Sequence, residues 1–259
     1  NASLQTGLRS NIDEAVINRA KEYNMPELTS KYIKLDEIPF DFARRRLSIA
    51  VKNEEGQDEL ITKGAVEEIL NISTSVEYRG VVSPLTREIK ENIQRISKNL
   101  NKEGLRVIAV CKKYSNEPGY DFEVKDEKNM ILIGFIGFLD PPKESAKEAV
   151  ERMNRAGIRV IVLTGDNAEV TKCICDKVNI KSKNIILGSE LDKLSDVAVH
   201  RLIKKNNIFA KLSPIQKARI VRLLKEQGNV VGYMGDGIND SPSLTNSDVG
   251  ISVDTAVDI

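Results

Sequence analysis

The order of apolar segments in the second half of the sequence constrains the fold more than any other feature. From Ile131 onward, short runs rich in β-branched and aliphatic residues alternate with segments of helical periodicity, a pattern typical of strand-helix-strand units. Units of this kind build a parallel sheet covered by helices. The expected strands are residues 131–139, 158–163, 184–187, 208–211, 230–234 and 249–253. The second half is therefore expected to be a doubly wound α/β domain.

Two helices in this half have clear sequence boundaries. Residues 143–156 carry apolar side chains at helical spacing and are followed by Gly157, a residue that commonly ends helices. A second helix is expected to begin at Ser213 and Pro214 and to end at Gly228, because serine is a preferred N-cap and proline fits the first turn. Each helix lies between two expected strands, as a parallel sheet requires.

The first part of the chain has a different pattern. A helix is expected at residues 11–23, and extended segments then alternate irregularly with helices. The extended segments are 46–52, 59–62 and 106–112, and the helices are 66–72 and 86–101. This order favours an α+β domain with an antiparallel sheet. The turn-rich segment 114–129 is expected to separate a first domain, 1–127, from a second, 128–259.

Charge and hydropathy bear on the partners of these domains. The 39 basic and 38 acidic residues give a net charge of +1, so the overall balance does not indicate a nucleic-acid-binding protein. The longest apolar stretch, 130–139, is about half of the roughly 20 residues that span a bilayer. We therefore expect soluble domains with no nucleic-acid partner.

An acidic loop follows the expected strand 230–234. It reads Gly-Asp-Gly-Ile-Asn-Asp and places Asp236 and Asp240 four residues apart, with Asn239 between them. Ligands bind at the carboxyl ends of strands in open α/β sheets, and carboxylates suit a hard cation such as Mg²⁺. The alternative is an ordinary turn, because Asp, Asn and Gly are the commonest turn residues.

Three further polar residues are expected at the same edge of the sheet. Thr164 and Asp166 follow the expected strand 158–163 at the start of a helix, where a hydroxyl and backbone N–H groups can bind an anion. Lys217 lies in the first turn of the helix that begins at Ser213. Taken singly, the first pair also fits a turn with an N-cap, and the lysine fits an ordinary surface position.

Taken together, these positions resemble the phosphotransferase fold of the haloacid dehalogenases and, within it, the P-type ATPases. The resemblance is carried by residues 140–143 (Asp-Pro-Pro-Lys), 164–166 (Thr-Gly-Asp) and 234–244 (MGDGINDSPSL). Lys143 departs from the arginine that usually ends the first motif. The resemblance implies a haloacid dehalogenase-like phosphorylation domain in which Asp140 contributes to cofactor binding.

The first domain resembles the nucleotide-binding domain of the same family. Lys63, Gly64 and Ala65 match its lysine-glycine motif, although Val66 stands where proline is usual, and Phe40 lies where the family stacks a ring on adenine. The resemblance implies nucleotide contacts from Asp13, Phe40, Arg45, Lys63, Gly64 and Arg106. Taken singly, Phe40 also fits a core position and Lys63 with Gly64 an ordinary turn.

The resemblance covers residues 5–259 and is greatest to the bacterial magnesium-import branch, through 39–51 (PFDFARRRLSIAV), 138–145 (FLDPPKES) and 250–259 (GISVDTAVDI). It implies the cytoplasmic ATP-binding and phosphorylation region of a multi-pass pump in the cell membrane, which couples ATP hydrolysis through an aspartyl phosphate to cation transport, here of Mg²⁺. The implied partners are ATP, the transported cation, and the membrane and actuator domains of the same polypeptide.

The resemblance also assigns roles in the phosphorylation site. Asp236 would bind Mg²⁺, and Asp240 and Asn239 would complete that metal loop. Thr164 and Lys217 would hold the phosphoryl oxygens, and Asp166 would support the site beside them. The family's Asp-Lys-Thr-Gly-Thr motif, which contains the phosphorylated aspartate, does not occur in these residues, so the chain alone is expected to be inactive.

Three alternatives remain at this stage. The transported ion could be Ca²⁺ or another cation, since selectivity resides in membrane helices. The chain could also be a soluble phosphatase of the same fold, or a nucleotide-binding module without catalysis. The upstream sequence distinguishes these classes, because only a pump has both the aspartate motif and hydrophobic spans.

Overall fold

The computed structural model describes residues 1–6, 11–23, 31–41, 43–115, 119–235 and 240–252. The chain divides into two compact units. The first consists of Asn1–Leu100 and Leu105–Leu139, and the second of Asn101–Gly104 and Asp140–Ile259.

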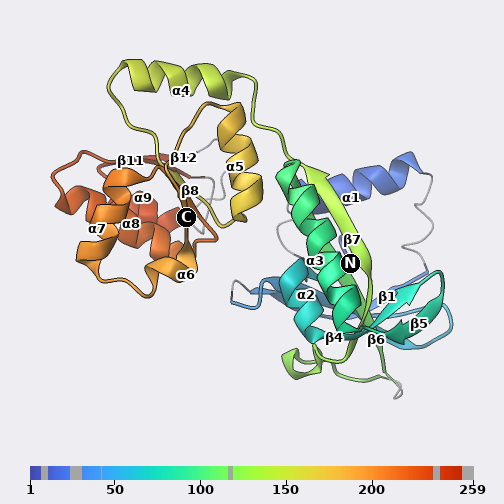
Figure 1. Cartoon of the computed structure of the whole chain (residues 1–259). Coiled ribbons are helices and arrows are strands. Elements are labelled where there is room, and N and C mark those ends of the chain that lie inside the picture. Colours follow the sequence, from blue (N-terminus) through green and yellow to red (C-terminus); the bar gives the residue numbers. More distant parts are fainter. Residues whose placement is uncertain (7–10, 24–30, 42, 116–118, 236–239, 253–259) are drawn as a thin grey trace. The chain divides into compact units, whose positions relative to one another are not determined.

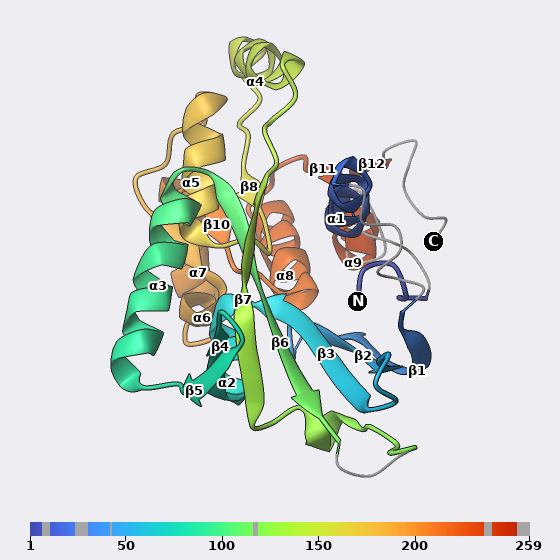
Figure 2. The same cartoon turned by 90° about the vertical axis from the view of Figure 1, so that its right-hand side faces the viewer.

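The first unit is built on a seven-stranded sheet with the order β1-β2-β3-β6-β7-β4-β5 (Figures 1 and 2). Its strands are β1 (Ile33–Asp41), β2 (Arg46–Lys52), β3 (Asp58–Ala65), β4 (Ser73–Tyr78), β5 (Val81–Pro84), β6 (Leu105–Tyr114) and β7 (Met130–Leu139). Neighbouring strands are antiparallel except for β4 and β7, which run parallel. The expected α+β class with an antiparallel sheet is confirmed for this unit.

Two helices, α2 (Val66–Ile72) and α3 (Arg87–Lys102), lie against one face of this sheet, which we call the helix face (Figure 1). Ile69 and Ile93 from these helices pack with Leu60 of β3 and Ala109 of β6 in the largest buried cluster of the unit. Val107, Ala109 and Cys111, alternate residues of β6, belong to this core, as the two-residue period of a strand requires.

The other face, which we call the opposite face, carries a second apolar cluster. Leu47, Ile49 and Val51 of β2 are buried there, and Leu4 and Tyr32 from the N-terminal part of the chain pack against them. The helix α1 (Asn11–Glu22) belongs to the same N-terminal part. A short 3₁₀ helix, η2 (Val124–Asp126), precedes β7.

The second unit contains two small parallel sheets. One has the order β8-β10-β9, from Val162–Leu163, Ile208–Ala210 and Ile185–Leu187, and the other pairs β11 (Gly232–Gly235) with β12 (Val249–Ser252). The helices are α4 (Ser145–Arg155), α5 (Ala168–Lys177), α6 (Gly188–Leu191), α7 (Asp196–Lys205), α8 (Pro214–Glu226) and α9 (Ser241–Asn246). Every strand pair described in this unit is parallel, as the alternation of strands and helices predicts.

One expected strand and the expected domain boundary are wrong. Residues 131–139 were expected to open the parallel sheet, but β7 pairs antiparallel with β6 and belongs to the sheet of the first unit. The compact units consequently divide after Leu139, and not after residue 127. A strand bonded on both sides is apolar in either kind of sheet, so composition alone does not reveal which sheet it joins.

No helix in the described ranges combines the length and apolar character needed to cross a membrane.

Candidate functional site

A direct contact joins two of the expected nucleotide residues, Asp13 and Lys63. Asp13 lies in the first turn of α1, is 2% exposed, and accepts a hydrogen bond from Lys63 Nζ in an ion pair. The same ammonium group donates to Gln5 Oε1 at 2.8 Å. A buried carboxylate needs such a partner, because an unpaired charge away from water is costly.

Lys63 and Arg106 lie on the opposite face of the seven-stranded sheet. Lys63 pairs in register with Leu47 of β2, which belongs to the apolar cluster of that face, and with Val110 of β6. Arg106 lies four residues before Val110 on β6. Because side chains alternate between the two faces of a strand, Arg106 and Val110 lie on the same face. The sheet therefore places two of the predicted cations on one surface.

Phe40 lies near the end of β1, where the register is irregular. The pairing of β1 with β2 shifts between Ile38 and Asp41, so two residues of β1, one of them Phe40, lie opposite Leu47. Leu47 also pairs with Lys63 of β3. Phe40 and Lys63 therefore lie at the same level of the sheet, with only β2 between them. Phe40 is 50% exposed, which contradicts a core position.

Gly64 is required by the close approach of β2. A Cβ atom at this position would lie 2.6 Å from the carbonyl oxygen of Arg45 and 2.6 Å from Arg46 Cβ. Contacts that short do not occur between non-bonded atoms, so any larger residue would push the strands apart. The glycine of the lysine-glycine motif therefore has a packing reason that is independent of any ligand.

Arg45 occupies the turn between β1 and β2. Its φ of 49° is in the left-handed region, which is uncommon for residues other than glycine. Its carbonyl oxygen accepts a hydrogen bond from Ala65 N at 3.1 Å, which ties the turn to β3. Within the described ranges, the guanidinium group of Arg45 forms no hydrogen bond or ion pair.

Thr164 and Asp166 lie in the loop that follows β8. Thr164 Oγ1 accepts a hydrogen bond from the backbone N–H of Asp166 at 3.1 Å and lies 3.3 Å from Asp166 Oδ2. The loop after β10 is tied to this loop, because Lys211 N donates to Asp166 O at 2.8 Å and Leu212 N donates to Thr164 O at 2.9 Å. Since β8 and β10 are parallel neighbours, both loops leave from the same edge of their sheet.

Lys217 contacts Asp240 across this region. Ser213 caps α8 by accepting from Gln216 N, as predicted, and Lys217 lies in the first turn of that helix. Its Nζ donates to Asp240 Oδ1 at 2.8 Å, and the same oxygen accepts from the hydroxyl of Tyr233 at 2.9 Å. Asp240 is 6% exposed, so the lysine neutralises a buried carboxylate.

Of the two predicted metal ligands, Asp236 and Asp240, the structure describes only Asp240. Asp236 and Asn239 lie outside the described ranges. Asp240 supplies carboxylate oxygens of the kind that Mg²⁺ prefers, but its Oδ1 is engaged by Lys217 and Tyr233. In the described part of the chain, no group of three or more His, Cys, Asp or Glu side chains could hold a metal ion. Asp140, the first residue of the second unit's main segment, is exposed.

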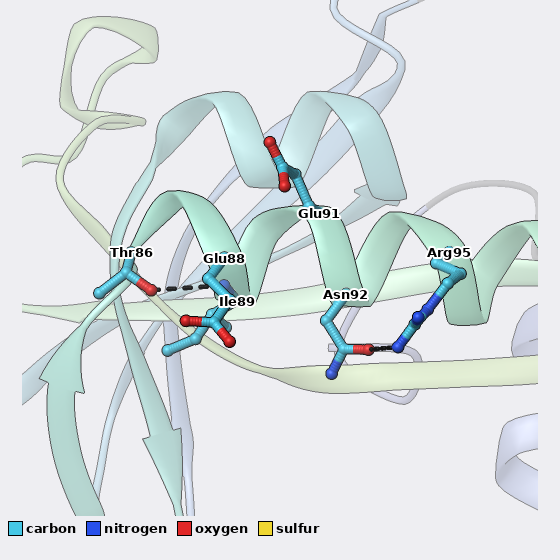
Figure 3. A pocket seen from close by; sticks show the side chains of 6 residues that line it. All are labelled: Thr86, Glu88, Ile89, Glu91, Asn92 and Arg95. Carbon is cyan, nitrogen blue, oxygen red and sulfur yellow. Dashed lines mark hydrogen bonds between the residues drawn. The ribbon is translucent and has the colours of Figure 1, made fainter.

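A surface hollow of about 700 Å³ lies elsewhere on the first unit (Figure 3). The side chains that line it come from the start of α3 and the residue before it: Thr86, Glu88, Ile89, Glu91, Asn92 and Arg95. None of these was expected to bind nucleotide. With two carboxylates against one guanidinium group, the hollow is a poor match for the phosphates of ATP.

Three residues that contact the candidate sites were missed by the sequence analysis. Gln5 and Glu127 contact Lys63 and the arginines of the β1–β2 turn across long stretches of sequence, and no local pattern marks such pairs. Tyr233 has glycine and methionine as its neighbours in the strand before the acidic loop, so no alternation of apolar and polar residues marks it, and its burial is a finding of the structure.

Comparison with known proteins adds independent findings. Residues 8–145 match the family model described as P-type ATPase, cytoplasmic domain N. Over its whole length the chain is 44% identical to magnesium-transporting ATPase, P-type 1, of Escherichia coli (strain K12) and of Salmonella typhimurium (strain LT2), and it covers 29% of each. It is 32% identical, over 98% of its length, to calcium-transporting ATPase 1 of Bacillus cereus, of which it covers 28%. The chain thus spans less than a third of these curated relatives.

Proposed function

Because the chain belongs to the P-type ATPases, whose cytoplasmic domain N matches residues 8–145, we propose that its first unit binds ATP. The binding surface is the opposite face of the seven-stranded sheet, around Lys63. Phe40 stacks on the adenine ring, and Lys63, Arg106 and Arg45 supply positive charge to the nucleotide. Asp13 holds Lys63 in place until the nucleotide competes for it.

One observation carries this proposal: the sheet register brings an exposed aromatic residue on β1 and a lysine on β3 to the same level of the sheet, with only β2 between them. Phe40 is 50% exposed although large apolar residues are normally buried, and a half-exposed ring beside cations suits the flat, anionic nucleotide. The Lys63 ammonium group already binds carboxylate and amide oxygens, so phosphate oxygens are chemically equivalent partners for it.

The second unit is proposed to be the haloacid dehalogenase-like phosphorylation domain. Its support is the common edge at which the loops after β8 and β10 are hydrogen-bonded, with Thr164 on one and Lys217 just beyond the other. Thr164 and Lys217 bind phosphoryl oxygens, Asp240 keeps Lys217 oriented, and Asp166 orders the Thr164 loop through its backbone N–H. A strand ending in the phosphorylated aspartate, from another part of the parent protein, completes the parallel sheet.

Mg²⁺ is proposed as the cofactor of this domain, held by Asp236 and Asp240 with Asn239 ordering the loop. When bound, the cation neutralises charge on the phosphoryl group during transfer. Asp140 is proposed to face the same site. The residues of this chain bind and orient the phosphoryl group, and the aspartate that accepts it is supplied by the parent protein.

The parent protein is proposed to be a multi-pass pump of the cell membrane with this region on its cytoplasmic side. It couples ATP hydrolysis to the transport of Mg²⁺, on the strength of 44% identity to magnesium-transporting relatives against 32% to a calcium-transporting relative. Its membrane and actuator domains are the partners of these two units. ATPase and ion-flux assays of the full-length protein in vesicles, with Mg²⁺ or Ca²⁺ as the only transportable cation, test the ion.

The nucleotide proposal is tested directly on the chain by calorimetric titration with ATP, ADP and inorganic phosphate. Binding of ATP and ADP but not of phosphate alone is expected, since the adenine ring contributes to affinity. A chain that is folded by circular dichroism and binds neither nucleotide contradicts the proposal.

A further inference from the structure

A single buried carboxylate engages two of three consecutive arginines at the turn after Phe40. Glu127 Oε1 and Oε2 accept hydrogen bonds from Arg44 Nη1 at 2.7 and 2.8 Å, and Oε2 also accepts from Arg46 Nε at 2.6 Å. The side chain of Glu127 has no exposed surface. It lies 83 and 81 residues from the two arginines, so these bonds join the β1–β2 turn to the segment before β7.

On the side that faces the sheet, Glu127 accepts a hydrogen bond from a buried hydroxyl group. Its Oε1 accepts from Ser48 Oγ at 2.7 Å, and Ser48 in turn shares a hydrogen bond of 2.7 Å with Thr62 of β3. Charge-assisted bonds from two guanidinium groups and a hydroxyl compensate a carboxylate that is removed from water. The position of this carboxylate is therefore fixed directly by groups of the β1–β2 turn and of β2, and indirectly, through Ser48, by β3.

On its outer side, Glu127 controls the turn through Arg44. Arg44 Nη2 donates to the carbonyl oxygen of Pro39 at 2.7 Å, directly before Phe40, and Arg44 N donates to Asp41 Oδ1 at 2.7 Å. From the other direction, the Arg45 carbonyl oxygen is held by Ala65 N. The backbone before Phe40 is thus fastened to Arg44, whose guanidinium group Glu127 holds, and the backbone of Arg45 is fastened to β3.

The three arginines consequently differ in availability. Arg44 and Arg46 are both engaged in ion pairs with Glu127, whereas Arg45 forms no hydrogen bond or ion pair within the described ranges. We propose that Glu127 is a positioning residue of the ATP site, which holds Phe40 and Arg45 where the nucleotide binds and withholds the neighbouring two arginines from it. This inference rests on the nucleotide proposal above, and it adds a residue on which the binding surface depends without touching the ligand.

The same chain offers a matched control for general destabilisation. Asp58 at the start of β3 is 1% exposed, lies 3.8 Å from Lys52 Nζ, and accepts backbone hydrogen bonds from Gly119 and Tyr120 at 2.5 and 3.2 Å. It is a buried carboxylate that fastens a loop to the same sheet, but at the end of β3 away from Lys63. Neutralising Asp58 should cost stability without moving the β1–β2 turn.

The experiment compares Glu127→Gln, Arg44→Met and Asp58→Asn with the unmodified chain. Two properties are measured: hydrogen exchange of the Ala65 amide, which reports the turn without any ligand, and ATP affinity by calorimetry. We expect Glu127→Gln and Arg44→Met to lose protection at Ala65 and to bind ATP about tenfold more weakly, the loss expected for one misplaced stacked ring. Asp58→Asn should match the unmodified chain in both.

The two readouts separate the possible failures. Retained Ala65 protection in a folded Glu127→Gln chain overturns the positioning role, and so does an equal loss of ATP affinity in Asp58→Asn. Loss of protection without loss of ATP affinity also overturns it, since the turn would then lie outside the nucleotide site. If the unmodified chain binds no ATP, the nucleotide proposal fails and the ATP-site role of Glu127 fails with it, while Ala65 exchange still decides whether Glu127 holds the turn. Arg44→Met keeps the test available if Glu127→Gln does not fold, because the Glu127–Arg46 pair remains intact in it.

Discussion

Asp13 and Lys63 are fifty residues apart in the chain and form an ion pair in which the carboxylate is almost fully buried. The lysine side chain is 18% exposed and the aspartate side chain 3%, so the pair lies largely away from water and the lysine keeps the larger share of contact with solvent. Lys63 is therefore assigned two roles, since its ammonium group compensates Asp13 and is proposed to bind the nucleotide. Stability and nucleotide affinity are therefore coupled at this residue.

Lys63→Met is predicted to lower both quantities. Removing the Lys63 ammonium group from the buried Asp13 carboxylate costs about 3–5 kcal/mol of unfolding free energy, and the double variant Asp13→Asn/Lys63→Met should recover much of that loss. Both variants should bind ATP more weakly than the unmodified chain, most clearly at low salt, because exposed charge–charge attraction is screened by ions. Urea unfolding and ATP titrations at two salt concentrations measure the effects, and equal ATP affinity in all three chains rules out a phosphate contact from Lys63.

Phe40→Ala is predicted to weaken ATP binding about tenfold or more, which corresponds to losing roughly 1–3 kcal/mol of ring stacking. Stacking is apolar, so this loss should be similar at low and high salt. The matched control is Tyr78→Ala, because Tyr78 is an exposed aromatic residue on β4 of the same sheet. A Phe40→Ala chain that binds ATP as the control does would place the adenine elsewhere.

Local patterns predicted much of the secondary structure but not the pairing of one strand. The strand Arg46–Lys52 and the helix Val66–Ile72 were predicted with the observed bounds, since alternation, helical period and capping act within a few residues. The assignment of β7 failed, because its partner β6 is chosen by tertiary packing that an apolar run does not specify.

The candidate site was predicted as a set of residues but not as a set of contacts. Motif resemblance named Asp13, Lys63, Lys217 and Asp240, and the structure joins them in two ion pairs. It could not name Glu127, because a buried carboxylate more than eighty residues from its arginine partners leaves no periodic trace. Long-range charge compensation is thus the part of the site that sequence reasoning missed.

Gly64→Ala is predicted to destabilise the first unit by about 1–3 kcal/mol or more, because overpacked positions force the backbone to move. The added Cβ would approach the Arg45 carbonyl oxygen to 2.6 Å. Gly134→Ala in β7 is the control, since a Cβ there would meet no atom within 4 Å. Thermal unfolding of the two variants measures the difference, and equal midpoints would contradict the packing role of Gly64.

Glu59→Gln is predicted to stabilise the chain near neutral pH. Burial raises the pKa of the Glu59 carboxyl above its ordinary value, the positive charge of Lys112 opposes that shift, and the negative charge of Glu77 adds to it. A raised pKa in the folded state means that folding favours the protonated carboxyl. The stability that protonated Glu59 contributes is therefore present at low pH and is lost as the pH rises through the folded-state pKa. The neutral glutamine should therefore raise the unfolding midpoint near neutral pH and have little effect below pH 4.5.

The control for this pH experiment is Glu77→Gln. Glu77 forms an ion pair of 2.8 Å with Lys112, and both side chains are largely buried. Its neutralisation removes a favourable pair and should lower the midpoint near neutral pH, the opposite sign to Glu59→Gln. Unfolding curves at several pH values that show the same sign for both variants would contradict the burial cost assigned to Glu59.

The chain of 259 residues is predicted to form no acid-stable phosphoenzyme, although it contains Thr164, Lys217 and Asp240. Groups that bind and orient a phosphoryl group lower the barrier only when a nucleophile is present to accept it, and no Asp-Lys-Thr-Gly-Thr segment occurs in these residues. Incubation with ATP labelled in the γ-phosphate, followed by acid precipitation, should leave the protein unlabelled. The full-length parent protein is the positive control, and Lys217→Ala in that protein should reduce its labelling, since the lysine is proposed to hold the transferring group. Near-stoichiometric labelling of the 259-residue chain would mean that one of its own side chains is the nucleophile, and it would overturn the proposed assignment of the second unit.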